Sequence, residues 1–91
     1  MIRSFRHKGL QKLWNDDDAS GIRPDLVERV RARLTALDAA TKLKELRVPG
    51  WRLHVLKGNP TRYSLTVNGP WRVTFGWRDG DAWRVDLEQY H

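Results

Sequence analysis

The chain has 91 residues, of which 17 are Lys or Arg and 11 are Asp or Glu, so its formal net charge is +6. A chain of this length is expected to form one small domain over residues 1–91. The absence of cysteine excludes disulfides and thiolate metal sites. The sequence has no apolar run near the ~20 residues that span a bilayer and no signal-peptide core, so we expect a cytoplasmic protein with an anionic partner.

The first half of the chain is expected to be mostly helical. Ile2–Phe5 is expected to form a short strand and His7–Trp14 a short helix, followed by a loop rich in aspartate. Pro24 favours a helix start, and apolar residues then recur at helical spacing, which predicts an amphipathic helix to about Ala39. One or two further turns are expected over Thr41–Leu46.

The apolar residues change to a period of two after residue 50. This alternation predicts four strands separated by short turns, over Trp51–Leu56, Tyr63–Asn68, Trp71–Arg78 and Trp83–Glu88. Helices followed by strands predict an α+β fold, in which the N-terminal helices pack on one face of an antiparallel sheet.

The alternation also predicts one covered and one open face of that sheet. The covered face is apolar and is expected to meet the helices. Its members are Trp51, Leu53, Val55, Tyr63, Leu65, Val67, Trp71, Val73, Phe75, Trp83, Val85 and Leu87. The open face is expected to be polar and basic, which suits a phosphate backbone. Its members are Arg52, His54, Ser64, Thr66, Arg72, Thr74, Arg84 and Asp86.

Basic and proton-transferring residues concentrate in the second half of the chain. Residues 51–78 hold five basic and no acidic residues, so a polyanion site is expected there. His54 is a candidate for acid–base catalysis, because an imidazole titrates near neutral pH; a surface histidine without a role is the alternative. Further basic residues are candidates for binding phosphate, with solvated strand residues as the alternative. They are Arg52, Lys57, Arg72 and Arg84.

The last two residues of the sequence, Tyr90 and His91, are either inert or a further pair of proton-transfer groups. The histidines at positions 7, 54 and 91 show no metal-ligand spacing, so we expect no metal and no cofactor.

Two further sets of residues are interpreted as structural. Three tryptophans are expected in the core, with base stacking as the alternative: Trp51, Trp71 and Trp83. Three arginines are expected to form a solvated helix face or to meet an acidic protein: Arg29, Arg31 and Arg33.

Four segments resemble the HigB toxins of the RelE/ParE superfamily, which belong to type II toxin–antitoxin systems. They are Ile2–Leu10, Pro49–Gly58, Tyr63–Phe75 and Tyr90-His91. The resemblance implies a RelE-like fold of the microbial RNase type with four or five strands. It implies an endoribonuclease that cuts mRNA in the A site of the 70S ribosome without a metal or cofactor. It also implies a HigA-like helix-turn-helix antitoxin, through which alone the toxin would meet operator DNA.

The resemblance also implies roles for particular residues. The catalytic histidine of the family falls on His54, and the last two residues of its C-terminal Asp-Tyr-His motif fall on Tyr90 and His91. Basic positions of the family fall on Lys57 and Arg72. The two catalytic histidines are then the natural acid–base pair, and which one is the acid stays open.

One position departs from the family pattern. Gln89 stands where the family commonly has aspartate, and an amide neither carries charge nor accepts a proton. Three explanations stay open. The aspartate of the family motif is dispensable, its role is taken by Asp86 or Glu88, or the activity of this chain is weakened. Two other classes of function stay open, a ParE-like toxin that acts on DNA gyrase without nuclease chemistry and a basic ribosome- or RNA-binding module.

Overall fold

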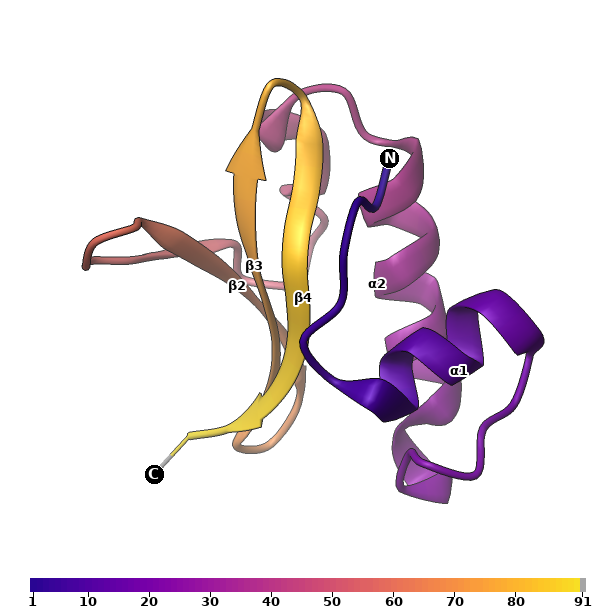
Figure 1. Ribbon diagram of the computed structural model, residues 1–91. Helices are drawn as coiled ribbons and strands as arrows, with labels where there is room; N and C mark the ends of the chain where they lie inside the picture. Colours follow the sequence, from indigo (N-terminus) through magenta and orange to yellow (C-terminus); the bar gives the residue numbers. More distant parts are fainter. Residues whose placement is uncertain (91) are drawn as a thin grey trace.

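The computed structural model describes residues 1–90, in which two helices pack against one face of a twisted, four-stranded antiparallel sheet (Figure 1). The expected α+β fold is confirmed. The sheet has the order β1-β2-β3-β4. The elements are α1 (Lys8–Asp16), η1 (Pro24–Leu26), α2 (Val27–Ala39), η2 (Leu43–Leu46), β1 (His54–Leu56), β2 (Arg62–Asn68), β3 (Trp71–Arg78) and β4 (Asp81–Gln89).

The segment before α1 lies along the outer edge of β4 (Figure 1). Instead of the expected strand, it forms two isolated parallel bridges, Ile2 to Ala82 and Phe5 to Val85. His7 then begins α1, because its Nδ1 atom accepts a hydrogen bond of 3.1 Å from the backbone amide of Leu10. The β4 edge of the sheet is therefore occupied, whereas the β1 edge has no strand partner among residues 1–90.

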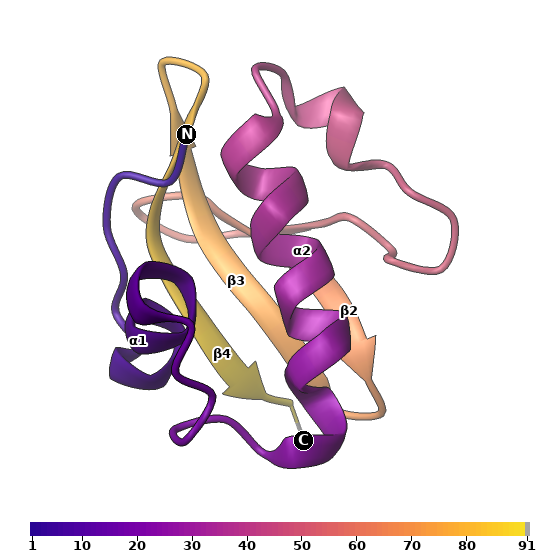
Figure 2. The same ribbon diagram turned by 90° about the vertical axis from the view of Figure 1, so that its right-hand side faces the viewer.

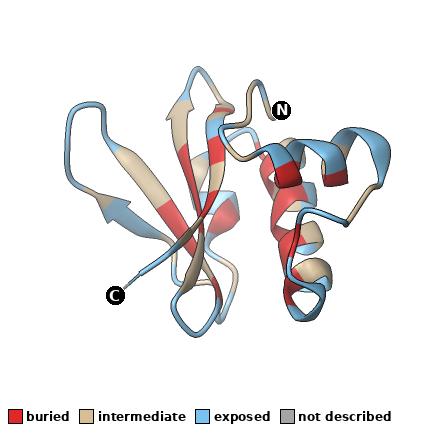
Figure 3. Cartoon of the chain, turned by 60° about the horizontal axis from the view of Figure 1, so that its bottom comes forward, coloured by how far each residue is buried: buried red, intermediate tan, exposed pale blue. Residues whose placement is uncertain are grey.

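The core lies between α2 and the sheet. Figure 2 shows α2 crossing β2 and β3, with α1 beside it over β4. In Figure 3 the buried residues of the helices and of the central strands face each other. Fully buried members from both layers include Leu10, Val30, Leu34, Leu37, Leu65, Val73, Phe75 and Val85.

The first strand differs from the prediction in length and burial. It begins at His54 rather than Trp51, because the Trp51 amide closes a turn on Val48 and Arg52 adopts a positive φ of 50°. Val55 was expected on the covered face, but it is 51% exposed. Figure 2 shows that α2 lies over the central strands, so it leaves this edge uncovered.

A β-bulge in β4 moves Trp83 to the face opposite to the predicted one. The pairing shifts between Thr74 and Gly76, and Arg84 has a φ of 51°. Trp83 consequently pairs with Gly76 and does not pack on the core, so the core prediction was wrong for this residue. Trp51 and Trp71 do pack against the core, as expected.

Arg33 was expected to be solvated, but only 7% of its surface is exposed. Its Nε atom donates to the Thr66 carbonyl at 3.0 Å, and its guanidinium lies 4.6 Å from the centre of the Trp51 ring. Burial, with a smaller effect from Arg29, lowers the pKa of Arg33. The buried guanidinium therefore joins α2 to β2 and to the loop before β1.

In the part of the chain that the structure describes, the helices lack the length and apolarity required to cross a membrane.

Candidate active site

The sheet face turned away from the helices, which we call the outer face, carries three neighbouring rows of residues across the strands. They follow from the register of the strands, in which residues of one face alternate along each strand. The histidine row is His54, Ser64, Thr74 and Asp86. The arginine row is Thr66, Arg72 and Glu88. The tryptophan row is Leu56, Arg62, Gly76 and Trp83.

Arg72 and Tyr90 lie together at the arginine row. The Arg72 guanidinium lies 5.4 Å from the centre of the Tyr90 ring, a cation–π contact. Its Nη1 atom donates to the carbonyl oxygens of Gly69 at 2.8 Å and Trp71 at 3.2 Å. The Tyr90 amide donates to the Pro70 carbonyl at 2.7 Å. The turn between β2 and β3 thus fixes a cation and a phenol side by side.

Glu88 lies on β4, opposite Arg72 on the outer face. Arg62 donates to its Oε2 atom at 2.8 Å, and the Thr74 hydroxyl donates to the same oxygen. Burial alone would raise the pKa of Glu88, but the hydrogen bonds from Thr74 and Arg62 outweigh it and hold the pKa below its ordinary value. Thr74 and Ser64, which were expected to be open to solvent, are buried. Thr74 is enclosed because it bonds into this network.

His54 lies at the free edge of the same face and is exposed to solvent. It pairs with Ser64, which in turn pairs with Thr74. Two strand spacings put its Cα atom about 10 Å from that of Thr74. His54 is therefore on the outer face, as the alternation predicted, at the opposite edge of its row from Asp86.

The off-pattern residue Gln89 is not on the outer face. Alternation along β4 puts it on the side of Leu87, whereas Asp86, Glu88 and Tyr90 alternate on the outer side. Asp86 accepts a hydrogen bond of 2.9 Å from the Leu87 amide. The two carboxylates considered as substitutes for the missing aspartate therefore both share a face with His54.

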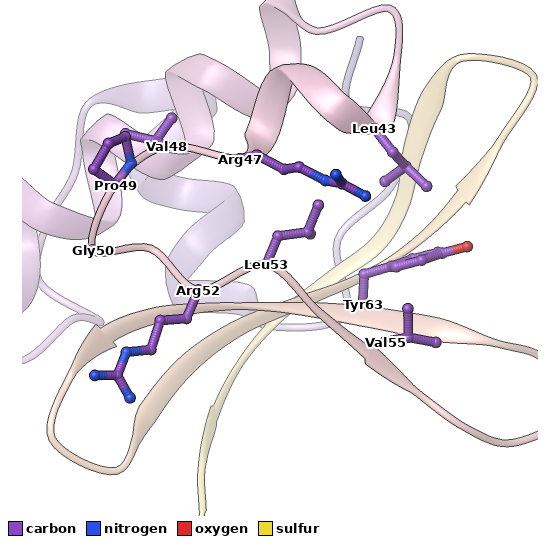
Figure 4. A pocket seen from close by; sticks show the side chains of 9 residues that line it. All are labelled: Leu43, Arg47, Val48, Pro49, Gly50, Arg52, Leu53, Val55 and Tyr63. Carbon is purple, nitrogen blue, oxygen red and sulfur yellow. The ribbon is translucent and has the colours of Figure 1, made fainter.

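The remaining candidates are spread around the outer face. Lys57 in the β1–β2 loop and Arg84 at the bulge line one groove, which also contains the tryptophan row. Arg52 precedes β1, and Figure 4 shows its side chain directed away from Leu53 and Arg47. His91 lies outside the described residues. The structure thus brings Arg72 to Tyr90 and leaves Arg52 apart from Lys57 and Arg84.

Two hollows lined by described residues were not predicted from the sequence. The hollow in Figure 4, of about 530 Å³, is mainly apolar and lies between η2 and β1, with Leu53, Val55 and Tyr63 in its lining. The groove beside the tryptophan row has a volume of about 730 Å³ and adds Arg62 and Arg78 to the predicted cations. Both arginines follow the polar alternation of their strands, so that pattern contained the signal for them.

Comparison with known proteins identifies the family. Residues 3–91 match the HigB-like toxins, described as the RelE-like toxin of the type II toxin–antitoxin system HigB. The chain is 44% identical over 92 residues to Endoribonuclease HigB of Proteus vulgaris, covering the whole of both chains. It is 34% identical over 93 residues to Toxin HigB-1 of Vibrio cholerae serotype O1, covering 99% of this chain and 98% of the relative. The predicted resemblance is confirmed: the chain belongs to the HigB-like toxins of type II toxin–antitoxin systems, and its partner is an antitoxin.

Proposed function

We propose that the chain is an endoribonuclease that cleaves mRNA in the ribosomal A site and thereby inhibits translation and growth. The observation that carries this proposal is the outer face, where His54, Arg72 and Tyr90 share a surface on the side away from the helices. The name of the Proteus vulgaris relative, Endoribonuclease HigB, supports the same activity.

The proposed chemistry is attack of a ribose 2′-hydroxyl on the adjacent phosphate. A base removes the 2′ proton, the 2′ oxygen bonds to phosphorus, and the bond to the 5′ oxygen of the next nucleotide breaks. An acid protonates that leaving oxygen, and cations stabilise the charge on the pentavalent phosphate. The products carry a 2′,3′-cyclic phosphate and a 5′-hydroxyl, and no step requires a metal or cofactor.

We assign the two proton transfers to His54 and His91 and the stabilisation of phosphate charge to Arg72 and Lys57. The geometry around Arg72 supports its role, because the stacking contact with Tyr90 and the bonds to the turn hold a cation in place before RNA binds. Tyr90 is assigned to orienting the nucleotide. The assignment of His91 depends on the family motif alone.

Arg52 and Arg84 are assigned to the RNA backbone farther from the scissile phosphate, because Arg52 lines the hollow between η2 and β1 and Arg84 lines the groove beside the tryptophan row. Gln89 does not weigh against the proposal. Its side chain belongs to the other side of β4, and the outer face has the carboxylates of Asp86 and Glu88.

The ribosome and the antitoxin complete the proposal. The site is an exposed surface with few groups, so positioning of the message by the decoding centre would supply orientation that the protein lacks. A HigA-like helix-turn-helix antitoxin would neutralise the toxin, and operator DNA would be bound through that antitoxin.

The test is primer extension on a message translated in vitro with the purified variants His54→Ala and His91→Ala. Loss of an acid or base is expected to reduce cleavage by about 10²–10⁴-fold. His7→Asn is the matched control, because asparagine keeps the helix cap and His7 begins α1, outside the three rows of the outer face. Its cleavage should equal that of the wild type, with a 2′,3′-cyclic phosphate on the upstream product.

Cleavage at the wild-type rate by both histidine variants would contradict the proposal. DNA breaks that depend on gyrase, without RNA cleavage, would assign the chain to the ParE-like class. Ribosome binding without cleavage by the wild-type protein would assign it to the RNA-binding modules.

A further inference from the structure

The groove beside the tryptophan row is a second basic feature of the outer face. It lies between the β1–β2 loop and β4 and has a volume of about 730 Å³. Among the described residues, its lining contains no Asp or Glu. The lining includes five cationic residues and a tryptophan: Arg6, Lys57, Arg62, Arg78, Arg84 and Trp83.

Part of this positive charge is not neutralised within the chain. Arg62 is paired with Glu88 at 2.8 Å, and Arg6 is 4.0 Å from Asp86. The other three cations of the groove have no carboxylate within 4.0 Å among residues 1–90. They are Lys57, Arg78 and Arg84. Three unpaired cations around one concave surface favour a ligand with several negative charges.

Trp83 gives the groove an aromatic floor. The bulge at Arg84 turns the indole to the outer face, opposite Gly76, where a Cβ atom would stand 3.9 Å from the Trp83 Cβ atom. The Arg78 guanidinium lies 4.4 Å from the centre of the indole ring, and the indole Nε1 donates to the Arg78 carbonyl at 3.4 Å. Because this ring does not pack on the core and is only partly buried, a ligand can stack on the face that Arg78 does not cover.

The groove is continuous with the proposed catalytic surface. Neighbouring rows of one sheet face are two residues apart, which corresponds to about 7 Å. The tryptophan row therefore adjoins the histidine row on one side, as the arginine row does on the other. An RNA strand that crosses the outer face from the arginine row over the histidine row would reach the tryptophan row next, where Trp83 lies on β4, at the edge opposite to His54.

We propose that this groove is an RNA subsite in which a base that flanks the cleavage site stacks on Trp83 while backbone phosphates contact Arg78, Arg84 and Lys57. The ligand is single-stranded, because only an unpaired base exposes its face to an aromatic ring. The inference rests on the proposed function, because it takes RNA as the substrate. It adds Trp83 as a specificity-determining residue outside the predicted catalytic set.

The test measures RNA binding in the His54→Ala background, where cleavage does not deplete the probe. Fluorescence anisotropy is recorded with a labelled single-stranded 9-mer, a 3-mer and a 9-base-pair RNA duplex. Trp83→Leu keeps an apolar side chain without a stacking face and is expected to weaken 9-mer binding about 10-fold. Trp83→Phe should restore most of that loss. The 3-mer should respond much less, because it is too short to occupy all three rows.

The charge contribution is tested separately with Arg78→Met. It is expected to reduce the slope of log affinity against log salt by about 0.7 for the single-stranded RNA, since one phosphate contact is lost. Arg29→Met, on the helix layer, is the matched control of equal charge and should change the slope little.

Equal 9-mer binding by Trp83→Leu and the parent would overturn the proposal, as would an equal loss for the duplex. An effect of Arg78→Met no larger than that of Arg29→Met would also overturn it. These outcomes are distinct from failure of the proposed function, which is measured by cleavage in chains that retain Trp83.

Discussion

The β3–β4 side and the β1 side of the outer face differ in how many contacts hold their residues in place. At the β3–β4 side, strands of eight and nine residues pair with each other, and the N-terminal segment covers the edge. There Arg72 is stacked on Tyr90, and Glu88 is bonded to Arg62 and Thr74. At the other side, His54 is on a three-residue edge strand beside the exposed Val55.

This difference separates anion binding from proton transfer in the proposed site. The Arg72 guanidinium, which would hold the phosphate, is fixed by hydrogen bonds before RNA arrives, whereas the strand that carries His54 has no strand partner on one side among residues 1–90. Short edge strands open locally at a low free-energy cost. The two ends should consequently respond differently to substitution, and stability and activity should depend on different residues.

The largest effect on stability is expected from Phe75→Ala. Phe75 is fully buried on β3 and stacks on Tyr63 at a centroid distance of 5.8 Å. Its truncation is expected to lower the free energy of unfolding by about 3–5 kcal/mol, because a cavity remains. Val55→Ala at the edge should change it by less than about 0.5 kcal/mol. Urea denaturation followed by circular dichroism measures both, and similar losses would contradict the comparison.

The next largest effect is expected in cleavage rather than stability. Arg72→Met removes the cation held on Tyr90 and is expected to reduce kcat/KM on a translated message about 100-fold, chiefly through kcat. Arg72→Lys keeps the charge but not the planar stacking group, so its kcat/KM should lie between those of the wild type and Arg72→Met. Arg29→Met supplies the control for lost charge, and an equal rate in it and Arg72→Met would exclude this role.

The parts of the fold that sequence patterns predicted are those set by local rules. Alternation places Val73 and Phe75 on the covered face and Arg72 on the outer face, because side chains of a strand alternate without exception unless a bulge intervenes. The same rule placed His54 on the correct face and predicted its exposure. The faces on which these candidate residues lie could therefore be predicted from the sequence.

The errors arise where distant segments decide the outcome. The bulge in β4 frees the Arg84 amide from the ladder, and the Ser4 hydroxyl accepts its hydrogen bond at 2.8 Å from a segment 80 residues away. Arg33 is buried because Trp51 and the Thr66 carbonyl happen to meet α2 at that turn. Neither contact leaves a periodic signal, so Trp83 and Arg33 were both assigned to the wrong environment.

The smallest effect is expected from Glu88→Gln, and it should depend on pH. Folding lowers the pKa of Glu88 from its ordinary value of 4.5, so the folded state favours the ionised form. The stabilisation is present above that value and is lost as the pH falls through the lowered pKa. At neutral pH the variant should be less stable by about 1 kcal/mol, because the half-buried carboxylate is partly screened by solvent.

Urea denaturation from pH 7 down to pH 3 measures this difference, which should shrink as the pH falls through the lowered pKa. Glu28→Gln removes an exposed carboxylate of α2 and should show a smaller difference with little pH dependence. If Glu88→Gln behaved like this control, the Arg62–Glu88–Thr74 network would not be a source of stability. The firmer support of the β3–β4 side would then come from strand pairing and core packing alone.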